Sequence, residues 1–452
     1  MTLIKRPPLQ KPCFDYELQA NASAEWLKTF IGDIHMRKRR LPQTVDPSVT
    51  RLKKLIEGRK ELRMWASAMF TEVPNKIPYD GFIPGRPPKN PVQGYEHMIE
   101  LFSVIVAEVA PTWTLSAAGL GLMGLPFQAV IDWPMGTPSG HAFFLDVQVN
   151  AAFKEILDVW RDKVLSTSVS RSVLTTEPGH WLCADAISAI EQDTNLDSKK
   201  RYTFEQLFDC DPRGDPVHWG FTSWDDFFVR KFRNIDTLRP VGYPGKAEWI
   251  VNPCESFPVV LKSEVQGRDQ FWLKQTRYSI YEMLDNHEWA ENFVGGTVYQ
   301  SVLRTTAYHR WSAPVSGRVV YAAVINGTYF SERSTNGLGD EAIVGPPYNQ
   351  VYLAHVATRA VIIIQADDPV GFVCFVGIGI ADVSTCEILP KFTTNLPQTI
   401  TKGEELGMFH YGGSCQCLVF RRGLKLAFVE EAVPGNQSRN VPIRSPLAFA
   451  YV

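Results

Sequence analysis

The spacing of the hydrophobic residues changes about half-way along the chain. In the first part, apolar residues recur every three or four positions, which is the period of an amphipathic α-helix. This pattern predicts helices over residues 51–65, 96–109 and 146–165. Residues 75–91 are rich in Pro and Gly, which is typical of a long surface loop. We therefore expect the first 200 residues to be mainly helical.

Apolar runs in the second part are shorter and rich in Val, Ile and Phe. They occur at residues 315–324, 360–364 and 372–380, and they predict β-strands. The last strands are expected at residues 417–420 and 424–429, where they should complete the sheet. The expected fold class is α+β, in which a helical N-terminal region is followed by an antiparallel β-rich domain.

Length and charge narrow the class of protein. The 452 residues suffice for more than one domain, and we expect a helical region over 1–200 and a β-rich domain over 201–452. The 46 Lys and Arg residues nearly balance the 48 Asp and Glu residues, which argues against a dedicated nucleic-acid binder. The longest uncharged run, residues 109–131, is interrupted by Pro and Gly. It predicts buried core and no stable membrane insertion.

Cysteine usage indicates a reducing compartment. The eight cysteines are scattered and lack the paired spacing of a metal site, so we expect no metal ion. The N-terminus has no secretory hydrophobic region. Together these features predict a cytoplasmic location.

A glycine pair precedes a serine in the segment Phe409–Cys415 (FHYGGSC). Glycines allow backbone conformations that residues with a Cβ resist. A tight β-bulge explains the pair equally well, and the lysine of a phosphate-binding loop is missing. Alone, Gly412-Gly413-Ser414 is a weak signal.

Three segments occur in the same order as three signatures of one enzyme family. They are Phe221–Pro240 (FTSWDDFFVRKFRNIDTLRP), Thr306–Gly317 (TAYHRWSAPVSG) and Gly403–Cys415 (GEELGMFHYGGSC). The signatures read approximately N-D-F-F-x-R-x-L-R-x-x-x-R-P, D-Y-H-R-x-H-x-P and G-x-x-L-G-x-F-x-x-G-S-T. The second half of the chain therefore resembles the phosphatidylserine decarboxylase family. The helical first half is similar to the soluble fungal branch of that family, which includes tryptophan decarboxylases of fungal secondary metabolism.

The resemblance implies a pyruvoyl enzyme that matures from a zymogen by autocatalytic cleavage. Ser414 Oγ would attack the Gly413 carbonyl, and residue 414 would become the pyruvoyl group. A strained residue without a side chain favours such an attack, and Gly413 provides it. The products would be a β chain 1–413 and an α chain 414–452 that remain associated. The pyruvoyl ketone forms a Schiff base with a substrate amine and serves as electron sink. Pyridoxal phosphate is not expected, because no lysine and phosphate loop suit it.

The resemblance also assigns roles to two other residues. His309 matches the first histidine of the middle signature, which handles the proton in decarboxylation, and imidazole titrates near neutral pH. Glu255 falls where the family has an aspartate that orients the processing histidine. A surface carboxylate is an open alternative for Glu255.

At position 312 the chain departs from the family. The second histidine of the middle signature, the expected base for self-cleavage, is Ser312 here, and a serine cannot replace imidazole as a base. Three explanations are open. Glu255 or His410 activates Ser414 instead, the position was changed to trap the precursor, or the protein does not mature.

The resulting functional prediction is a pyruvoyl-dependent decarboxylase of a free L-amino acid, with tryptophan as the leading substrate. Two alternatives are open. One is a phosphatidylserine decarboxylase, and the other is an unprocessed, non-catalytic relative. The partner expected for the leading hypothesis is a small-molecule amino acid, with no nucleic acid.

Overall fold

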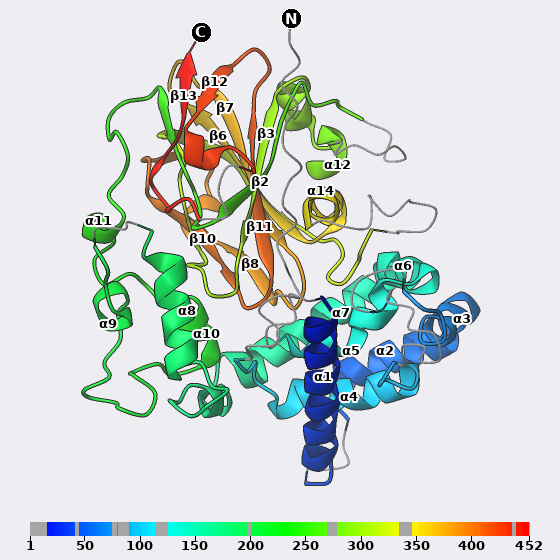
Figure 1. Ribbon diagram of the computed structural model, residues 1–452. Helices are drawn as coiled ribbons and strands as arrows, with labels where there is room; N and C mark the ends of the chain where they lie inside the picture. The colour runs from blue at the N-terminus through cyan, green and yellow to red at the C-terminus, as the bar shows by residue number, and fades with distance from the viewer. Residues whose placement is uncertain are drawn as a thin grey trace, which may run out of the picture.

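The computed structural model has a helical N-terminal part and a C-terminal part rich in antiparallel sheet (Figure 1). The predicted α+β fold class is confirmed. The structure describes residues 16–40, 45–74, 79, 90–113, 125–196, 200–268, 278–333, 346–435 and 440–451. Most of the loop predicted over residues 75–91 lies outside the described residues.

Eight helices of eight residues or more occur among the described residues of the N-terminal part. They are α1 (Tyr16–Lys38), α2 (Pro47–Gly58), α3 (Lys60–Ala68), α4 (Tyr95–Glu108), α5 (Pro126–Met135), α6 (Pro138–Leu145), α7 (Val147–Trp160) and α8 (Ala184–Thr194). The helix predicted over 51–65 is split between α2 and α3, because Arg59 adopts an extended conformation. Helix α4 confirms the prediction over 96–109. Helix α7, with a π-helical turn at Arg161–Leu165, confirms the one over 146–165.

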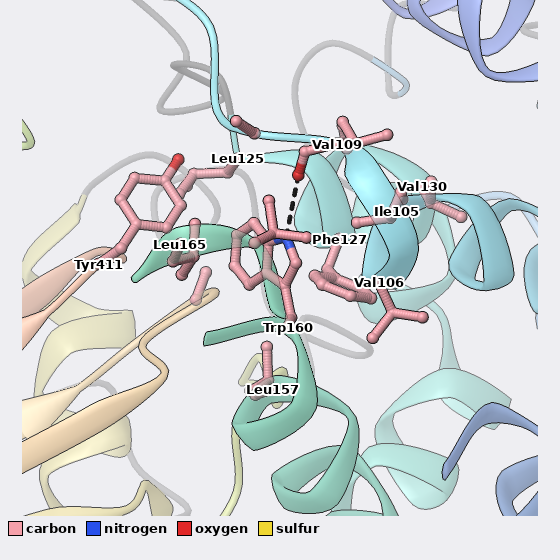
Figure 2. Packing of buried hydrophobic residues seen from close by; sticks show 14 of the residues in the cluster. Ile105, Val106, Val109, Leu125, Phe127, Val130, Leu157, Trp160, Leu165 and Tyr411 are labelled. Atoms are coloured by element: carbon pink, nitrogen blue, oxygen red, sulfur yellow. Dashed lines mark hydrogen bonds between the residues drawn. The ribbon is translucent and has the colours of Figure 1, made fainter. Parts of the chain in front are cut away.

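Trp160 is fully buried in the core between these helices (Figure 2). Its indole N–H donates a hydrogen bond to the Val109 carbonyl oxygen at 2.9 Å, which satisfies the only polar atom of the ring. The ring contacts Phe127 of α5 and Tyr411 of the C-terminal part, with centroids 5.1 and 5.6 Å apart. The segment directly before Gly412 is therefore anchored in the helical core.

The C-terminal part contains one large and two small antiparallel sheets in the described residues. The large sheet has the order β2-β3-β11-β7-β6-β5-β9, and the small sheets have the orders β4-β10-β8 and β1-β13-β12. The strands are β1 (Trp249–Val251), β2 (Phe257–Ser263), β3 (Thr297–Leu303), β4 (Arg310–Ser312), β5 (Gly317–Ile325), β6 (Arg359–Ala366), β7 (Phe372–Gly379), β8 (Thr385–Ile388), β9 (Gln398–Ile400), β10 (Glu405–His410), β11 (Ser414–Phe420), β12 (Lys425–Phe428) and β13 (Pro446–Tyr451).

Strand β11 is an interior strand of the large sheet, between β3 and β7, and is buried along its whole length. One face packs on the helices beside the sheet, and the other packs toward β4 and β10. The two last strands predicted from the sequence therefore have different places. Strand β11 is central to the large sheet, whereas β12 belongs to a small one.

Further α-helices follow residue 200. They are α9 (Phe204–Leu207), α10 (Trp224–Phe228), α11 (Ile235–Leu238), α12 (Ile280–Met283) and α14 (Pro346–Val356). Helices α12 and α14 cover one face of the large sheet (Figure 1). Within the described part of the chain, none of the helices has the length and apolar character needed to cross a membrane. The domain boundary near residue 200 stays a prediction.

Candidate active site

Ser414 is the first residue of β11 and is buried. It pairs with Leu303 of β3 and Gly379 of β7. Because side chains alternate along a strand, Ser414 shares a face with Leu418 and Phe420, which pack toward the sheet that contains β4. The Oγ atom has no hydrogen-bond partner among the described residues. A buried hydroxyl left unpaired costs about 1–3 kcal/mol, so its retention suggests a role.

The two glycines before Ser414 differ in their surroundings. Gly412 has a φ of +140°, and a Cβ added there would lie 2.2 Å from the Val383 nitrogen. Gly413 is not among the residues with positive φ, and its added Cβ would meet its nearest atom, Ile380 Cβ, at 3.7 Å. The prediction of backbone strain at Gly413 is therefore wrong. The conformational requirement lies one residue earlier, at Gly412.

The peptide groups around the Gly413–Ser414 bond are fixed by backbone hydrogen bonds. The Gly413 carbonyl oxygen accepts a hydrogen bond from the Ile380 N–H at 2.8 Å. The Gly413 N–H donates to the Ala381 carbonyl oxygen, also at 2.8 Å. The carbonyl that self-cleavage would attack is thus held and polarised, while the hydroxyl beside it is unpaired. These features fit the precursor of a pyruvoyl group.

His309 is buried just before β4, and its ring stacks on Phe228 of α10 with centroids 3.9 Å apart. Burial lowers the pKa of His309 well below its usual value, and the charge of Arg230 lowers it further. The Ala307 carbonyl opposes these effects weakly, although neither ring nitrogen makes a hydrogen bond of normal geometry within the described residues. The imidazole is therefore neutral at neutral pH.

Arg230 fixes the segment that precedes His309. Its guanidinium donates to the carbonyl oxygens of Thr306 and Ala307 at 2.6 and 3.2 Å and lies over the Phe208 ring. Burial lowers the pKa of Arg230 to about 10, so the group keeps its charge at neutral pH. A buried cation thus stands beside a neutral histidine.

Glu255 is buried and forms an ion pair with Arg239. The Arg239 Nε atom lies 3.1 and 3.0 Å from the two carboxylate oxygens, and its Nη2 atom makes a further short contact. The Ile443 N–H also donates to this carboxylate, at 2.8 Å. Glu255 is therefore not a surface carboxylate. Its hydrogen bonds, however, go to Arg239 and Ile443 and not to a histidine.

Ser312 ends β4, and its N–H donates to the Pro253 carbonyl oxygen at 2.9 Å. Its hydroxyl is buried and has no partner among the described residues. The residue lines a cavity of about 120 Å³, and Ser414 does not line that cavity. Ser312 therefore makes no hydrogen bond to the Ser414 hydroxyl, as the replacement of the family histidine leads one to expect.

His410 lies between two carboxylates. Its Nδ1 is 2.8 Å from Asp225 Oδ1 of α10, and its Nε2 is 2.9 Å from Glu387 Oε2 of β8. Burial alone would lower the pKa of His410, but hydrogen bonds and charge from the two carboxylates raise it above its usual value. Because both ring nitrogens are bonded to carboxylates, His410 is poorly suited to take a proton from Ser414.

The site contains residues to which the sequence analysis gave no role. Arg230, Arg239 and Asp225 belong to the first family signature, so their positions were visible although their partners were not. Asp382, described below, lies outside all three signatures. Among the described residues, no three His, Cys, Asp or Glu side chains are grouped so that they could hold a metal ion.

Comparisons with known proteins agree with this arrangement. Residues 46–190 and 224–440 both match families described as phosphatidylserine decarboxylase. Decarboxylase iboD of Amanita muscaria is 37% identical over 72% of this chain and 91% of its own length. An L-tryptophan decarboxylase of Psilocybe cubensis is 33% identical over 75% of each chain. Phosphatidylserine decarboxylase proenzyme 3 of Schizosaccharomyces pombe is 25% identical over 51% of this chain and 22% of its own.

The two matched segments together span most of the helical part and most of the sheet-rich part. The predicted resemblance is thereby confirmed over both halves of the chain. The chain belongs to the phosphatidylserine decarboxylase family of pyruvoyl-dependent carboxy-lyases.

Proposed function

We propose that the chain is a pyruvoyl-dependent decarboxylase of a free aromatic L-amino acid, with tryptophan as the leading substrate. The observation that carries the proposal is the buried, unpaired Ser414 hydroxyl directly after a carbonyl held by a backbone N–H. The choice of substrate rests on the relatives named L-tryptophan decarboxylase. Their similarity extends over both the helical and the sheet-rich parts.

The self-cleavage step needs only groups of this chain and water. Ser414 Oγ loses its proton and bonds to the Gly413 carbonyl carbon, and the peptide C–N bond then breaks with proton transfer to nitrogen, which gives an ester. Loss of the Cα proton of residue 414 expels the Gly413 carboxylate and leaves dehydroalanine. Water converts dehydroalanine into the pyruvoyl group and ammonia. When formed, that ketone supplies the electron sink for loss of CO₂.

His309 is the proposed proton carrier for the decarboxylation. A histidine with a lowered pKa is neutral at rest, and once protonated it is a strong acid that gives its proton up readily. A substrate carboxylate entering the site would raise that pKa by opposing the charge of Arg230. The stacked Phe228 ring fixes the imidazole plane, so proton transfer would occur in a defined direction.

The proposed α chain 414–452 would stay attached after cleavage. Its strand β11 is hydrogen-bonded to β3 on one side and β7 on the other, and its β13 pairs with β1. Removing the α chain would divide the large sheet. The cleaved chains are therefore expected to form one folded unit.

An unprocessed, non-catalytic relative is the second candidate function. It is favoured by the absence of any hydrogen bond from a described residue to the Ser414 hydroxyl. Glu255 is engaged by Arg239, and His410 is engaged by Asp225 and Glu387. Neither proposed substitute for the missing histidine is free to act as a base.

The deciding experiment is an intact mass of the purified chain under denaturing conditions, with Ser414→Ala as control. The proposed function expects two species, 1–413 and a pyruvoyl-blocked 414–452, and release of CO₂ and amine from tryptophan, tyrosine or phenylalanine without added pyridoxal phosphate. A single species of 50.9 kDa would instead support the unprocessed, non-catalytic relative. Cleaved protein that acts only on phosphatidylserine vesicles would replace the amino-acid substrate by a lipid.

A further inference from the structure

Residues 411–413, beside the proposed cleavage site, are joined by backbone hydrogen bonds to the loop 380–384 that follows β7. We call this pairing the clamp. Three backbone hydrogen bonds join them: Ile380 N–H to Gly413 O, Gly413 N–H to Ala381 O, and Ser384 N–H to Tyr411 O, at 2.8, 2.8 and 3.0 Å. The close approach explains why Gly412 has no room for a side chain. The position of the Ile380 N–H therefore depends on the shape of the loop 380–384.

That loop is in turn fixed to the helical part by Asp382. Its carboxylate is fully buried and accepts hydrogen bonds from Phe127 N and Gln128 N at 3.0 and 2.9 Å, in the first turn of α5. A carboxylate at a helix N-terminus satisfies free N–H groups and interacts favourably with the helix dipole. Asp382 also has a φ of +55°, which Asp tolerates better than most residues.

Both sides of the clamp are thus attached to the helical part. Asp382 attaches the loop to α5, and Tyr411 inserts between helices beside Trp160 and Leu165 (Figure 2). The two attachments come from segments far apart in the sequence. They converge on the single peptide bond that is to be cut.

We propose that the Ile380 N–H is the oxyanion donor for self-cleavage, and that Asp382 is a positioning residue that holds this N–H in place through α5. As Ser414 Oγ adds to the Gly413 carbonyl, negative charge develops on the oxygen that already accepts this hydrogen bond. A fixed backbone donor there stabilises the transition state. Cleavage is thereby coupled to the docking of the helical part on the sheets. The proposal rests on the proposed self-cleavage.

The test compares Asp382→Asn with Asp146→Asn. Both aspartates accept hydrogen bonds from the first turn of a helix, α5 and α7 respectively, but Asp146 makes no contact with the cleavage segment. Burial raises the pKa of Asp382 to about 7, against the two backbone hydrogen bonds, so the acceptor oxygens and not a full charge distinguish it from asparagine at neutral pH. Asparagine tolerates the φ of residue 382 while replacing one of the two accepting oxygens by an NH₂ group. Chains made by cell-free translation are sampled over time for conversion of the full chain into 1–413 and 414–452.

We expect Asp382→Asn to slow cleavage by about tenfold or more, since small displacements at a reacting centre have large effects on rate. Asp146→Asn should cleave within about twofold of the unchanged protein, although it also weakens a helix cap and an ion pair with Arg59. In a Ser414→Ala background, Asp382→Asn should also speed hydrogen exchange of the Ile380 amide. Asp146→Asn should not.

A second variant covers the case in which Asp382→Asn does not fold. Gln128→Pro removes one of the two donors from the helix side and leaves the loop sequence intact. It should also slow cleavage. Cleavage at the unchanged rate in either folded variant would overturn the positioning role but leave the proposed function standing. An unchanged protein that never cleaves would overturn both.

Discussion

The peptide bond proposed for cleavage and the groups expected to activate Ser414 are organised to very different degrees. The Gly413 carbonyl lies in a network of backbone hydrogen bonds that reaches into α5. The Ser414 hydroxyl has no partner among the described residues, and Glu255 is committed to an ion pair. If the proposed cleavage takes place, backbone hydrogen bonds of the fold are enough to hold the Gly413 carbonyl for attack. Activation of the nucleophile depends on side chains that differ here from those of the family.

The largest effect is expected from Gly412→Ala, which disturbs the hydrogen-bonded segment around the Gly413 carbonyl. The new Cβ would lie 2.2 Å from a backbone nitrogen, at a φ that disfavours alanine, so the clamp cannot form. Cleavage should fall below detection in a time course followed by intact mass.

Gly413→Ala is the matched control for that prediction. Its Cβ meets only an ordinary contact at 3.7 Å, so the fold should be kept and cleavage should continue at a measurable rate. Equal loss in the two variants would show that the clamp is not what distinguishes the two glycines.

Ser312→His should supply the base that the Ser414 hydroxyl lacks. Ser312→His restores the histidine that the middle family signature has at this position, and a positioned general base contributes about 10²–10⁴-fold. Cleavage of newly translated chain should accelerate toward that range, with Ser312→Asn as a control of similar size that cannot act as a base. If the histidine variant cleaves no faster than the asparagine variant, position 312 does not supply the base in this chain.

Glu255→Gln tests whether that carboxylate is structural. It leaves the Arg239 charge buried without its partner, which typically costs about 3–5 kcal/mol of the free energy of unfolding. Urea unfolding would measure this loss. Glu155→Gln, in the exposed pair with Arg51, should leave the free energy of unfolding almost unchanged. If Glu255→Gln is as stable as the unchanged protein, the carboxylate is not needed for stability, and the orienting role that the family assigns to this position would be favoured.

The smallest expected effects are on the pH dependence of stability, which His309 and His410 should change in opposite directions. The pKa of His309 is lowered, so its contribution to stability should fall as the pH drops below about 6.5, where the unfolded chain takes up the proton first. The pKa of His410 is raised, so its contribution is present below about 6.5 and is lost as the pH rises through the folded value. Each slope is at most about 1.4 kcal/mol per pH unit. Thermal unfolding of His309→Phe and His410→Gln from pH 5 to 8 should show slopes changed in opposite senses.

Local patterns explain why the fold was predictable. The helical period of residues 96–109 and the apolar runs that became β6 and β7 each depend on neighbouring residues. The three signatures located Ser414, His309 and Ser312 for the same reason. The central place of β11 was not predictable, because strand order depends on pairing with β3 and β7 from distant parts of the chain.

The partners of buried side chains could not be predicted from the sequence either. Glu255 meets Arg239 across 16 residues, and Asp382 meets Phe127 across 255. Nothing near Asp382 signals a helix cap, because the helix it caps lies in the other half of the molecule. The error at Gly413 has a similar cause, since only the folded loop shows which of two adjacent glycines lacks room.

The central position of β11 has a consequence for how the mature protein would respond to stress. If residue 413 is severed from 414 as proposed, an interior strand of the seven-stranded sheet, β11, belongs to a separate short polypeptide. Folding of the intact chain is unimolecular. Reassembly of the severed protein would be bimolecular, because β3 and β7 would stay unpaired until β11 of the other polypeptide binds between them. Thermal loss of the mature protein should then be irreversible, with a lifetime set by the rate at which the sheet opens and not by an equilibrium.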